Sequence, residues 1–274
     1  MAEIVGAVGL PHTPYFPAMV SRDDPADATS QLFANLARRL RAARVDTIVM
    51  FDSDHFNTFF LENWPTFAIG VAPQMSGPND GTLGIESRSI DIPLDMAQAV
   101  LDHTVESGFD LAVSQSFTID HSIMVPLHYL ETDAAVLPVF VNGMVPPLPS
   151  AQRCAALGRT VVEAVRDMPG DNRVALVASG SFSIELGGPR LEQGKLWGVP
   201  DKNWAARTFD YLQAGDVEGL VAAATPEQLR RAGNVGGELL NWIAVASATK
   251  DAPQFLEAQE DIGHAFAWWN MGGA

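Results

Sequence analysis

The 274-residue sequence is poor in several features that would restrict its function. It contains one cysteine, Cys154, so no internal disulfide can form and a reducing compartment is expected. No run of about 18 apolar residues occurs, which argues against a membrane-spanning helix. The first residues, MAEIVGAVGLPHTP, lack a basic region ahead of an apolar one, so we expect no signal peptide and a cytoplasmic location. We find no internal repeat.

Positive charge is also scarce. The chain has 17 Lys and Arg residues against 33 Asp and Glu residues, and its formal net charge at pH 7 is −16. Such a surface repels phosphate backbones, so nucleic acid is not an expected partner. Hydrophobic residues make up 47% of the sequence, which is enough for a globular protein with a substantial core.

What the sequence does contain is an alternation of short apolar segments with amphipathic helical segments. We predict strands at residues 4–10, 47–51, 66–72, 111–114, 134–142 and 173–181. We predict helices at residues 28–44, 93–108, 150–167 and 237–249. This alternation predicts an α/β protein with a single domain over residues 1–274, a mainly parallel central sheet flanked by helices, and a helical C-terminal third.

Histidines follow two of the predicted strands directly. His12 in GLPHTP follows the first strand, and His55 in IVMFDSDHF follows the second. Because functional groups of parallel α/β sheets gather beyond the carboxyl ends of the strands, these two imidazoles are candidates to lie side by side. Of the other histidines, we expect His103 on the solvated face of a helix and His264 in aromatic packing, while His128 belongs either to the core or to a pocket.

Glu238 is the one ionisable side chain between Arg231 and Lys250. Two interpretations are open: a favourable position near a helix N-terminus, worth roughly 0.3–1 kcal/mol, or pairing with a cation. Two neutral imidazoles and one carboxylate form the facial triad of non-heme Fe(II) oxygenases, which leaves positions for a bidentate substrate and dioxygen. Because the three candidates lie far apart in the sequence, their spacing alone does not decide between these interpretations.

Several dispersed motifs occur in a fixed order along nearly the whole chain. They are PHTP at 11–14, DHFNTFFLENWPTFAIG at 54–70, DHSIMVPL at 120–127, PVFVNGMVPPLP at 138–149, ASGSFS…GGPR at 178–190 and AGNVGGELLNWIA at 232–244. In these motifs the sequence resembles the class III extradiol ring-cleavage dioxygenases, the group of the protocatechuate 4,5-dioxygenase β subunit.

The resemblance implies an iron enzyme whose reactants are a small aromatic substrate and dioxygen. It implies that His12, His55 and Glu238 bind Fe(II). It also implies that His121, in DHSIMVPL, lies beside the substrate as a hydrogen-bonding or acid–base residue.

Two aspartates close to His55 are candidates for a supporting role. We expect Asp52 or Asp54 to orient a ligand imidazole by accepting a hydrogen bond from the ring nitrogen that does not bind the metal. The other aspartate would then bind backbone amides in the turn.

One position departs from the family pattern. Members usually read Ser-Gly-Gly-Leu-Ser-His, with the histidine as catalytic base, where this chain reads SGSFSI at residues 179–184. Ile184 carries no titratable proton, and three interpretations follow. His121 or His128 takes over the role, or the substrate is acidic enough for iron alone to deprotonate it, or ring cleavage is lost. Substrates of that acidity include electron-poor catechols, hydroxypyridones and enolised diketones.

In addition to Ile184, four further residues are candidates for the substrate pocket. Phe182 and Trp64 either form an apolar pocket wall or pack in the core. Asn142 either contacts a substrate oxygen or closes a turn. Arg190 either binds a substrate carboxylate with its planar guanidinium or makes a surface ion pair.

We therefore expect an Fe(II)-dependent extradiol-type dioxygenase with an altered proton-transfer apparatus. One alternative is a metal-dependent C–C hydrolase or lyase on the same scaffold, and another is a noncatalytic subunit of a heteromeric dioxygenase. The sequence carries no obvious lid segment, so a small partner subunit, a homodimer contact or the C-terminal aromatic residues would have to cover the pocket.

Overall fold

The computed structural model describes residues 1–22, 24–249, 251–259 and 263–272. Its strands are β1 (Glu3–Leu10), β2 (Thr47–Asp52), β3 (Phe67–Gly70), β4 (Gln74–Gly77), β5 (Arg88–Asp91), β6 (Ala112–Ser114), β7 (Ala135–Val141), β8 (Arg173–Ser179), β9 (Glu185–Leu186), β10 (Trp197–Gly198), β11 (Phe255–Gln259) and β12 (His264–Asn270). Its helices are α1 (Phe16–Met19), α2 (Ala28–Ala42), α3 (Leu94–Glu106), α4 (His121–Leu130), α5 (Ala151–Asp167), α6 (Lys202–Ala214), α7 (Val217–Ala223), α8 (Pro226–Arg231) and α9 (Leu239–Ala246), with a 3-10 turn η1 (Gly236–Glu238) before α9.

A central sheet has the strand order β11-β12-β1-β8-β2-β7-β3-β6. Its middle strands β1, β8, β2 and β7 are parallel to one another, whereas β12 and β3 run antiparallel to their neighbours β1 and β7. Strand β2 is buried at every residue, as expected for the middle of a sheet that is covered on both faces. The predicted mainly parallel sheet flanked by helices is therefore confirmed.

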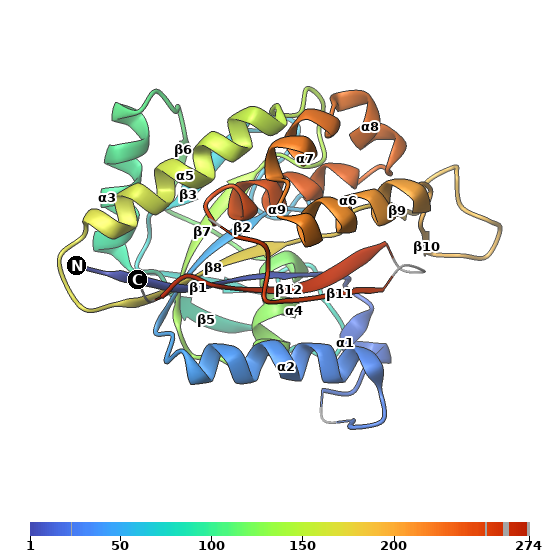
Figure 1. The fold of residues 1–274 in the computed structure, drawn as a ribbon, viewed down its shortest axis with the longest axis horizontal. Helices are drawn as coiled ribbons and strands as arrows, with labels where there is room; N and C mark the ends of the chain where they lie inside the picture. The colour runs from blue at the N-terminus through green and yellow to red at the C-terminus, as the bar shows by residue number, and fades with distance from the viewer. Residues whose placement is uncertain (23, 250, 260–262, 273–274) are drawn as a thin grey trace.

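Helices cover both faces of this sheet. Figure 1 shows α5 and α9 together with α6 and α7 on one side, and α2 with α4 on the other. Helix α5 packs on α9 and α9 on β8, while α2 packs on α4 and α4 on β2. No helix in the ranges given above is long and apolar enough to cross a lipid bilayer.

The C-terminal third is not entirely helical. It contains helices α6 to α9, but two strands that the sequence pattern did not predict, β11 and β12, follow them. Strand β12 is buried over six of its seven residues, so its sequence is apolar almost throughout. A short continuous apolar run of this kind fits a buried helix as well as a buried strand, and periodicity alone does not distinguish them. By pairing antiparallel with β1, it extends the sheet beyond the parallel strands.

The strand register places the carboxyl ends of β1, β2 and β8 at one edge of the sheet. Leu10 pairs with Ser179, and Phe51 pairs with Ala178. The loops that begin at residues 11, 53 and 180 therefore leave the sheet close together, and the candidate histidines lie in the first two of them.

Candidate metal centre

Two histidines meet at the carboxyl edge of the sheet. His12 is buried in the loop after β1, and His55 lies in the loop after β2 with its side chain 11% exposed. Their ring centroids are 5.2 Å apart and the ring planes make an angle of 77°. The two imidazoles lie side by side as predicted, although β8 separates β1 from β2 in the sheet, so the two strands are not direct neighbours.

Glu238 reaches the same point from the 3-10 turn that leads into α9. Its Oε1 lies 3.0 Å from Nε2 of His12 and 3.4 Å from Nε2 of His55. Its Oε2 accepts a hydrogen bond from the backbone N–H of Ser181 (2.9 Å). A glycine at position 180, with φ of +149°, permits this approach, because a Cβ there would lie 2.7 Å from the Cβ of Glu238.

The tautomer of His12 is set by a chain of hydrogen bonds that starts in α4. Pro126 has no N–H to offer to the carbonyl of Ser122, one turn earlier in the helix. That carbonyl instead accepts a hydrogen bond from the Ser179 hydroxyl (2.6 Å). Because the hydroxyl has donated its single proton, its oxygen accepts from Nδ1–H of His12 (2.8 Å). Nε2 of His12, the other ring nitrogen, faces Oε1 of Glu238, and in a neutral ring it carries the lone pair.

His55 is oriented by Asp120, a residue that the sequence did not single out. Asp120 is the N-cap of α4, and its Oδ1 accepts from the backbone N–H of Ser122 (2.8 Å). Its Oδ2 accepts from the backbone N–H of His55 (2.7 Å) and from Nδ1–H of the same residue (3.0 Å). Burial alone would raise the pKa of Asp120, but the imidazoles of His55 and His121 outweigh it and hold that pKa well below its usual range.

Asp52 and Asp54 therefore do not have the expected orienting role. Within the described residues neither carboxyl hydrogen-bonds to an imidazole. Asp54 accepts from the backbone N–H groups of residues 57, 58 and 59, which closes the turn. Burial, followed by the charges of Asp120 and Asp54, raises the pKa of Asp52 well above its ordinary value, and its Oδ2 accepts a hydrogen bond from the Ser122 hydroxyl (3.3 Å).

The donor atoms of this cluster fit a cation. With the Nδ1–H groups of both rings donated to Ser179 and Asp120, neutral imidazoles turn their Nε2 lone pairs toward Oε1 of Glu238, and such groups repel one another unless a proton or a metal cation lies among them. Burial lowers the pKa of His55, but Asp120 and Glu238 outweigh it and raise that pKa well above the ordinary value. The pKa of Glu238 is lowered by the two imidazoles, although burial acts against them. Two imidazoles and one carboxylate are also a ligand set that suits Fe(II).

His121, the first residue of α4, adds a third imidazole to the cluster. One ring nitrogen from each of His12, His55 and His121 lies within 4.8 Å of the other two. Nδ1 of His121 is in close hydrogen-bond contact with Asp80, and Nε2 is buried with no hydrogen-bond partner among the described residues. Burial and the neighbouring His55 lower the pKa of His121, so its ring is neutral.

The apolar pocket candidates are buried to different degrees. Phe182 packs in the core, edge-on to Trp242, with ring centroids 4.8 Å apart. Trp64 is half-buried and lies against Phe56 at a centroid distance of 4.7 Å. Ile184 is buried, with 3% of its surface exposed. For Phe182, the core-packing interpretation is the one that fits these contacts.

The polar pocket candidates use their hydrogen-bonding groups within the protein. The Asn142 amide donates to the carbonyl of Val145 (2.6 Å), and its Oδ1 accepts from the backbone N–H of the same residue (2.9 Å), so the side chain closes a turn. Arg190 forms a close ion pair with the buried Glu185, and its guanidinium also donates to the carbonyl of Arg231 (3.1 Å). It is more than a surface ion pair, because it ties the β9 segment to the end of α8.

The remaining histidines lie outside the cluster. His128 packs edge-on against Tyr129 and lies seven residues beyond His121 in α4, which corresponds to about 10 Å along the helix axis. His103 lies on α3, 3.8 Å from Glu163. His264 packs against Phe16 with ring centroids 5.5 Å apart, and burial lowers its pKa to about 3. Of the two histidines proposed to replace the base at position 184, only His121 lies at the centre.

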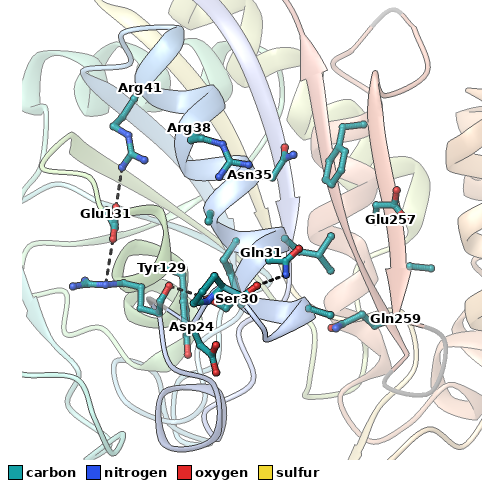
Figure 2. Close-up of a pocket in the computed structure, with 18 residues that line it drawn as sticks. Asp24, Ser30, Gln31, Asn35, Arg38, Arg41, Tyr129, Glu131, Glu257 and Gln259 are labelled. Atoms are coloured by element: carbon teal, nitrogen blue, oxygen red, sulfur yellow. Dashed lines mark hydrogen bonds and ion pairs between the residues drawn. The ribbon is translucent and has the colours of Figure 1, made fainter.

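A groove of about 920 Å³ lies elsewhere on the molecule, between α2 and β11. Figure 2 shows its polar lining, in which Arg41 points toward Glu131. Glu131 also forms an ion pair with Arg22 (3.3 Å). None of the histidines described above lines the groove. Because the groove contains none of these histidines, we do not place the reaction there despite its volume.

Comparison with known proteins shows the family of the chain. Residues 6–269 match the family model described as the catalytic LigB subunit of aromatic ring-opening dioxygenase. The chain is 31% identical, over 280 aligned residues, to a 2,3-dihydroxyphenylpropionate/2,3-dihydroxicinnamic acid 1,2-dioxygenase of Klebsiella pneumoniae (strain 342), and the alignment covers 87% of each protein. A second relative, the 2,3-dihydroxyphenylpropionate/2,3-dihydroxicinnamic acid 1,2-dioxygenase 2 of Pseudomonas putida, is 32% identical over 185 aligned residues, which cover 66% of this chain and 57% of the relative.

Among solved structures, the chain is similar to a crystal structure of an uncharacterised protein from Escherichia coli K12. The TM-score is 0.59, and the match covers 96% of this chain and 99% of the other. At 14% sequence identity this similarity supports the fold alone.

Proposed function

The chain belongs to the family of catalytic LigB subunits of aromatic ring-opening dioxygenases, and from this premise we propose that it opens a catecholic or related acidic ring with dioxygen at an Fe(II) centre. We infer that His12, His55 and Glu238 hold the metal. The observation that carries the proposal is the convergence of the two Nε2 atoms on one carboxylate oxygen, with both Nδ1 atoms engaged elsewhere.

Bound Fe(II) would supply open positions for two substrate oxygens and dioxygen, together with the charge that favours a deprotonated substrate. The residues around it do the rest. Ser179 and Asp120 keep the two Nε2 atoms aimed at one point, because each fixes the Nδ1 proton of its histidine. Ser181 holds the other oxygen of Glu238, so Oε1 is the atom left to bind metal.

Proton transfer in this enzyme would depend on His121. Its neutral ring and unpartnered Nε2 suit a group that accepts a proton from a substrate hydroxyl. Ile184 offers nothing at the position where the family has a base. We therefore propose a substrate that ionises easily at the metal, such as an electron-poor catechol or a hydroxypyridone.

Residues 1–274 would act as one catalytic domain. We propose that it works in the cytoplasm, either as a homodimer or with a small subunit that covers the pocket.

Oxygen uptake by iron-loaded protein tests the proposal. Protein loaded with Fe(II) under anaerobic conditions should consume dioxygen with at least one member of a panel of catechols and hydroxypyridones, and removal of the metal by a chelator should abolish the uptake. Product formation from the same panel without dioxygen would favour a metal-dependent hydrolase or lyase instead. Protein that retains no iron and consumes no dioxygen would favour a noncatalytic subunit.

Restoring an imidazole at position 184 should widen the substrate range. In Ile184→His we expect turnover of ordinary catechols at neutral pH to rise by about tenfold or more, since a positioned base contributes roughly 10²–10⁴-fold. The variant should lose about 1–3 kcal/mol of stability if the new ring finds no partner in this buried site. Ile184→Gln is the matched control, because it is polar but carries no titratable proton. Equal rates in the two variants would show that the pocket uses another proton route.

A further inference from the structure

Asp80 contacts His121 through Nδ1 of its ring, which leaves Nε2 free of this contact. It lies in the loop after β4, and its Oδ2 accepts a close hydrogen bond from Nδ1–H of His121 and a longer one from the backbone N–H of the same residue (3.4 Å). Its Oδ1 accepts from the hydroxyl (2.7 Å) and the backbone N–H (3.3 Å) of Thr82. Both oxygens are therefore fixed by donors, so the carboxylate has one orientation.

Asp80 is ionised in this environment. Burial by itself would raise its pKa, but the hydrogen bonds from His121 and Thr82 outweigh burial and lower the pKa to about 2. An ionised carboxylate accepts hydrogen bonds and has none to donate. The proton in the contact must consequently belong to Nδ1 of His121.

A neutral imidazole with its proton on Nδ1 carries a lone pair on Nε2. In His121 that Nε2 is buried and has no hydrogen-bond partner among the described residues. The ring lies 4.2 Å from the ring of His55 and 5.5 Å from that of His12, measured between centroids. The unpartnered acceptor therefore belongs to a ring that borders the metal centre.

Other charged groups face His121 as well, but none of them makes this contact. Asp120 precedes it in the chain and directs its two oxygens to His55 and to the backbone of Ser122. His12 and His55 present ring edges and faces to it. Among these neighbours, Asp80 alone hydrogen-bonds to its imidazole within the described residues.

We propose that Asp80 is a positioning residue, which holds His121 in the Nδ1–H tautomer so that Nε2 accepts the proton of a substrate hydroxyl at the metal centre. The proposal rests on the function proposed above. It gives one reason why a chain with isoleucine at position 184 can keep a working base, since the remaining imidazole is locked in the protonation pattern that a base requires.

Asp80→Asn tests this assignment, with Asp91→Asn as its matched control. Asp91 is an exposed residue of β5, the strand paired with β4, and it contacts Gln74 rather than a histidine. In Asp80→Asn an amide N–H can face Nδ1, which favours the opposite tautomer of His121. We expect kcat for the best substrate of the panel to fall about 10²- to 10⁴-fold in Asp80→Asn, with KM changed less than threefold, and neither to change in Asp91→Asn.

A spectroscopic arm makes the test independent of turnover. NMR of the full chain with isotope-labelled histidine and Zn(II) in place of iron reports which ring nitrogen of His121 carries the proton. The unsubstituted protein should show Nδ1–H for the signal that disappears in His121→Phe, and Asp80→Asn should shift that signal toward Nε2–H. An unsubstituted protein that consumes no dioxygen would refute the proposed function, while the tautomer of His121 would still decide the role of Asp80.

Thr82→Val provides a second variant in case Asp80→Asn does not fold. It removes one donor to Asp80 and leaves the carboxylate in place, so we expect a fall in kcat of about threefold to tenfold in the same direction. If His121 keeps the Nδ1–H tautomer in both variants and kcat stays at the value of Asp91→Asn, Asp80 is not a positioning residue.

Discussion

Glu238→Gln is expected to leave a folded protein that no longer retains iron. The variant amide is nearly isosteric with the carboxylate, so its oxygen can still accept from Ser181, while its two N–H groups can face the Nε2 lone pairs of His12 and His55. The free energy of unfolding of the metal-free variant should therefore differ from that of the metal-free parent by no more than about 1 kcal/mol.

The loss of function should be much larger than this change in stability. An amide that donates to both imidazoles occupies their lone pairs and brings no negative charge, so a divalent cation has neither the ligands nor the charge balance it needs. Iron content should fall from about one atom per chain to near zero, and oxygen uptake should fall by more than the roughly 10–100-fold that loss of a supporting hydrogen bond costs.

Glu218→Gln, at an exposed position of α7, is the control for a simple loss of charge. Its iron content and oxygen uptake should equal those of the parent. Metal analysis together with urea unfolding separates the two effects. A Glu238→Gln protein that binds iron stoichiometrically would show that this carboxylate is not a ligand.

Asp120→Asn is expected to weaken the same centre without removing a ligand. The amide can still accept from Nδ1–H of His55, but it no longer supplies the negative charge that makes this imidazole a better electron donor. We expect Fe(II) affinity to fall about 10–100-fold, with oxygen uptake partly recovered at high iron concentration. Asp110→Asn, at an exposed position, is the matched control. If its Fe(II) affinity falls as much as that of Asp120→Asn, the effect is caused by net charge and not by the contact to His55.

The same substitution should have a pH-dependent effect on the stability of the metal-free protein. The lowered pKa of Asp120 gives stability that is present above its unfolded value of about 3.9 and is lost as pH falls through the folded pKa. The raised pKa of His55 gives stability that is present below its unfolded value of about 6.5 and is lost as pH rises through the folded pKa. The difference in unfolding free energy between parent and Asp120→Asn should therefore be largest between about pH 4 and pH 6.5. A difference that does not vary with pH would contradict this pairing.

The sequence predicts those residues of the site that directly follow a strand. His12 and His55 each follow a clear apolar run, and parallel strands bring their carboxyl ends together, so local pattern and general sheet geometry suffice. Glu238 needed more, because its sequence surroundings fit a helix N-terminus as well as a metal ligand. The meeting of its Oε1 with two imidazoles favours the pairing with a cation, and the same residue also lies at the N-terminus of α9.

The supporting residues were harder to predict, for two different physical reasons. Asp120 was detectable in principle, since an aspartate before an apolar helical run is a standard N-cap, but Pro126 obscured helix α4. Asp80 had no such signal. It reaches His121 because the loop after β4 docks against the segment before α4, where Ser76 forms a bridge to Thr118. A contact of that kind depends on tertiary packing, which periodicity does not encode.

The C-terminal strands escaped prediction for a similar reason. Strand β12 is apolar at nearly every position because it lies inside a covered sheet, so it lacks the alternation that marks a half-exposed strand.

Anomalous diffraction from crystals of iron-loaded protein, recorded at the iron absorption edge, tests the central claim most directly. We predict one peak per chain, at about 2.0–2.2 Å from Nε2 of His12, Nε2 of His55 and Oε1 of Glu238. A peak that lies among the three imidazoles without Glu238, or one located away from His12 and His55, would contradict the proposed centre.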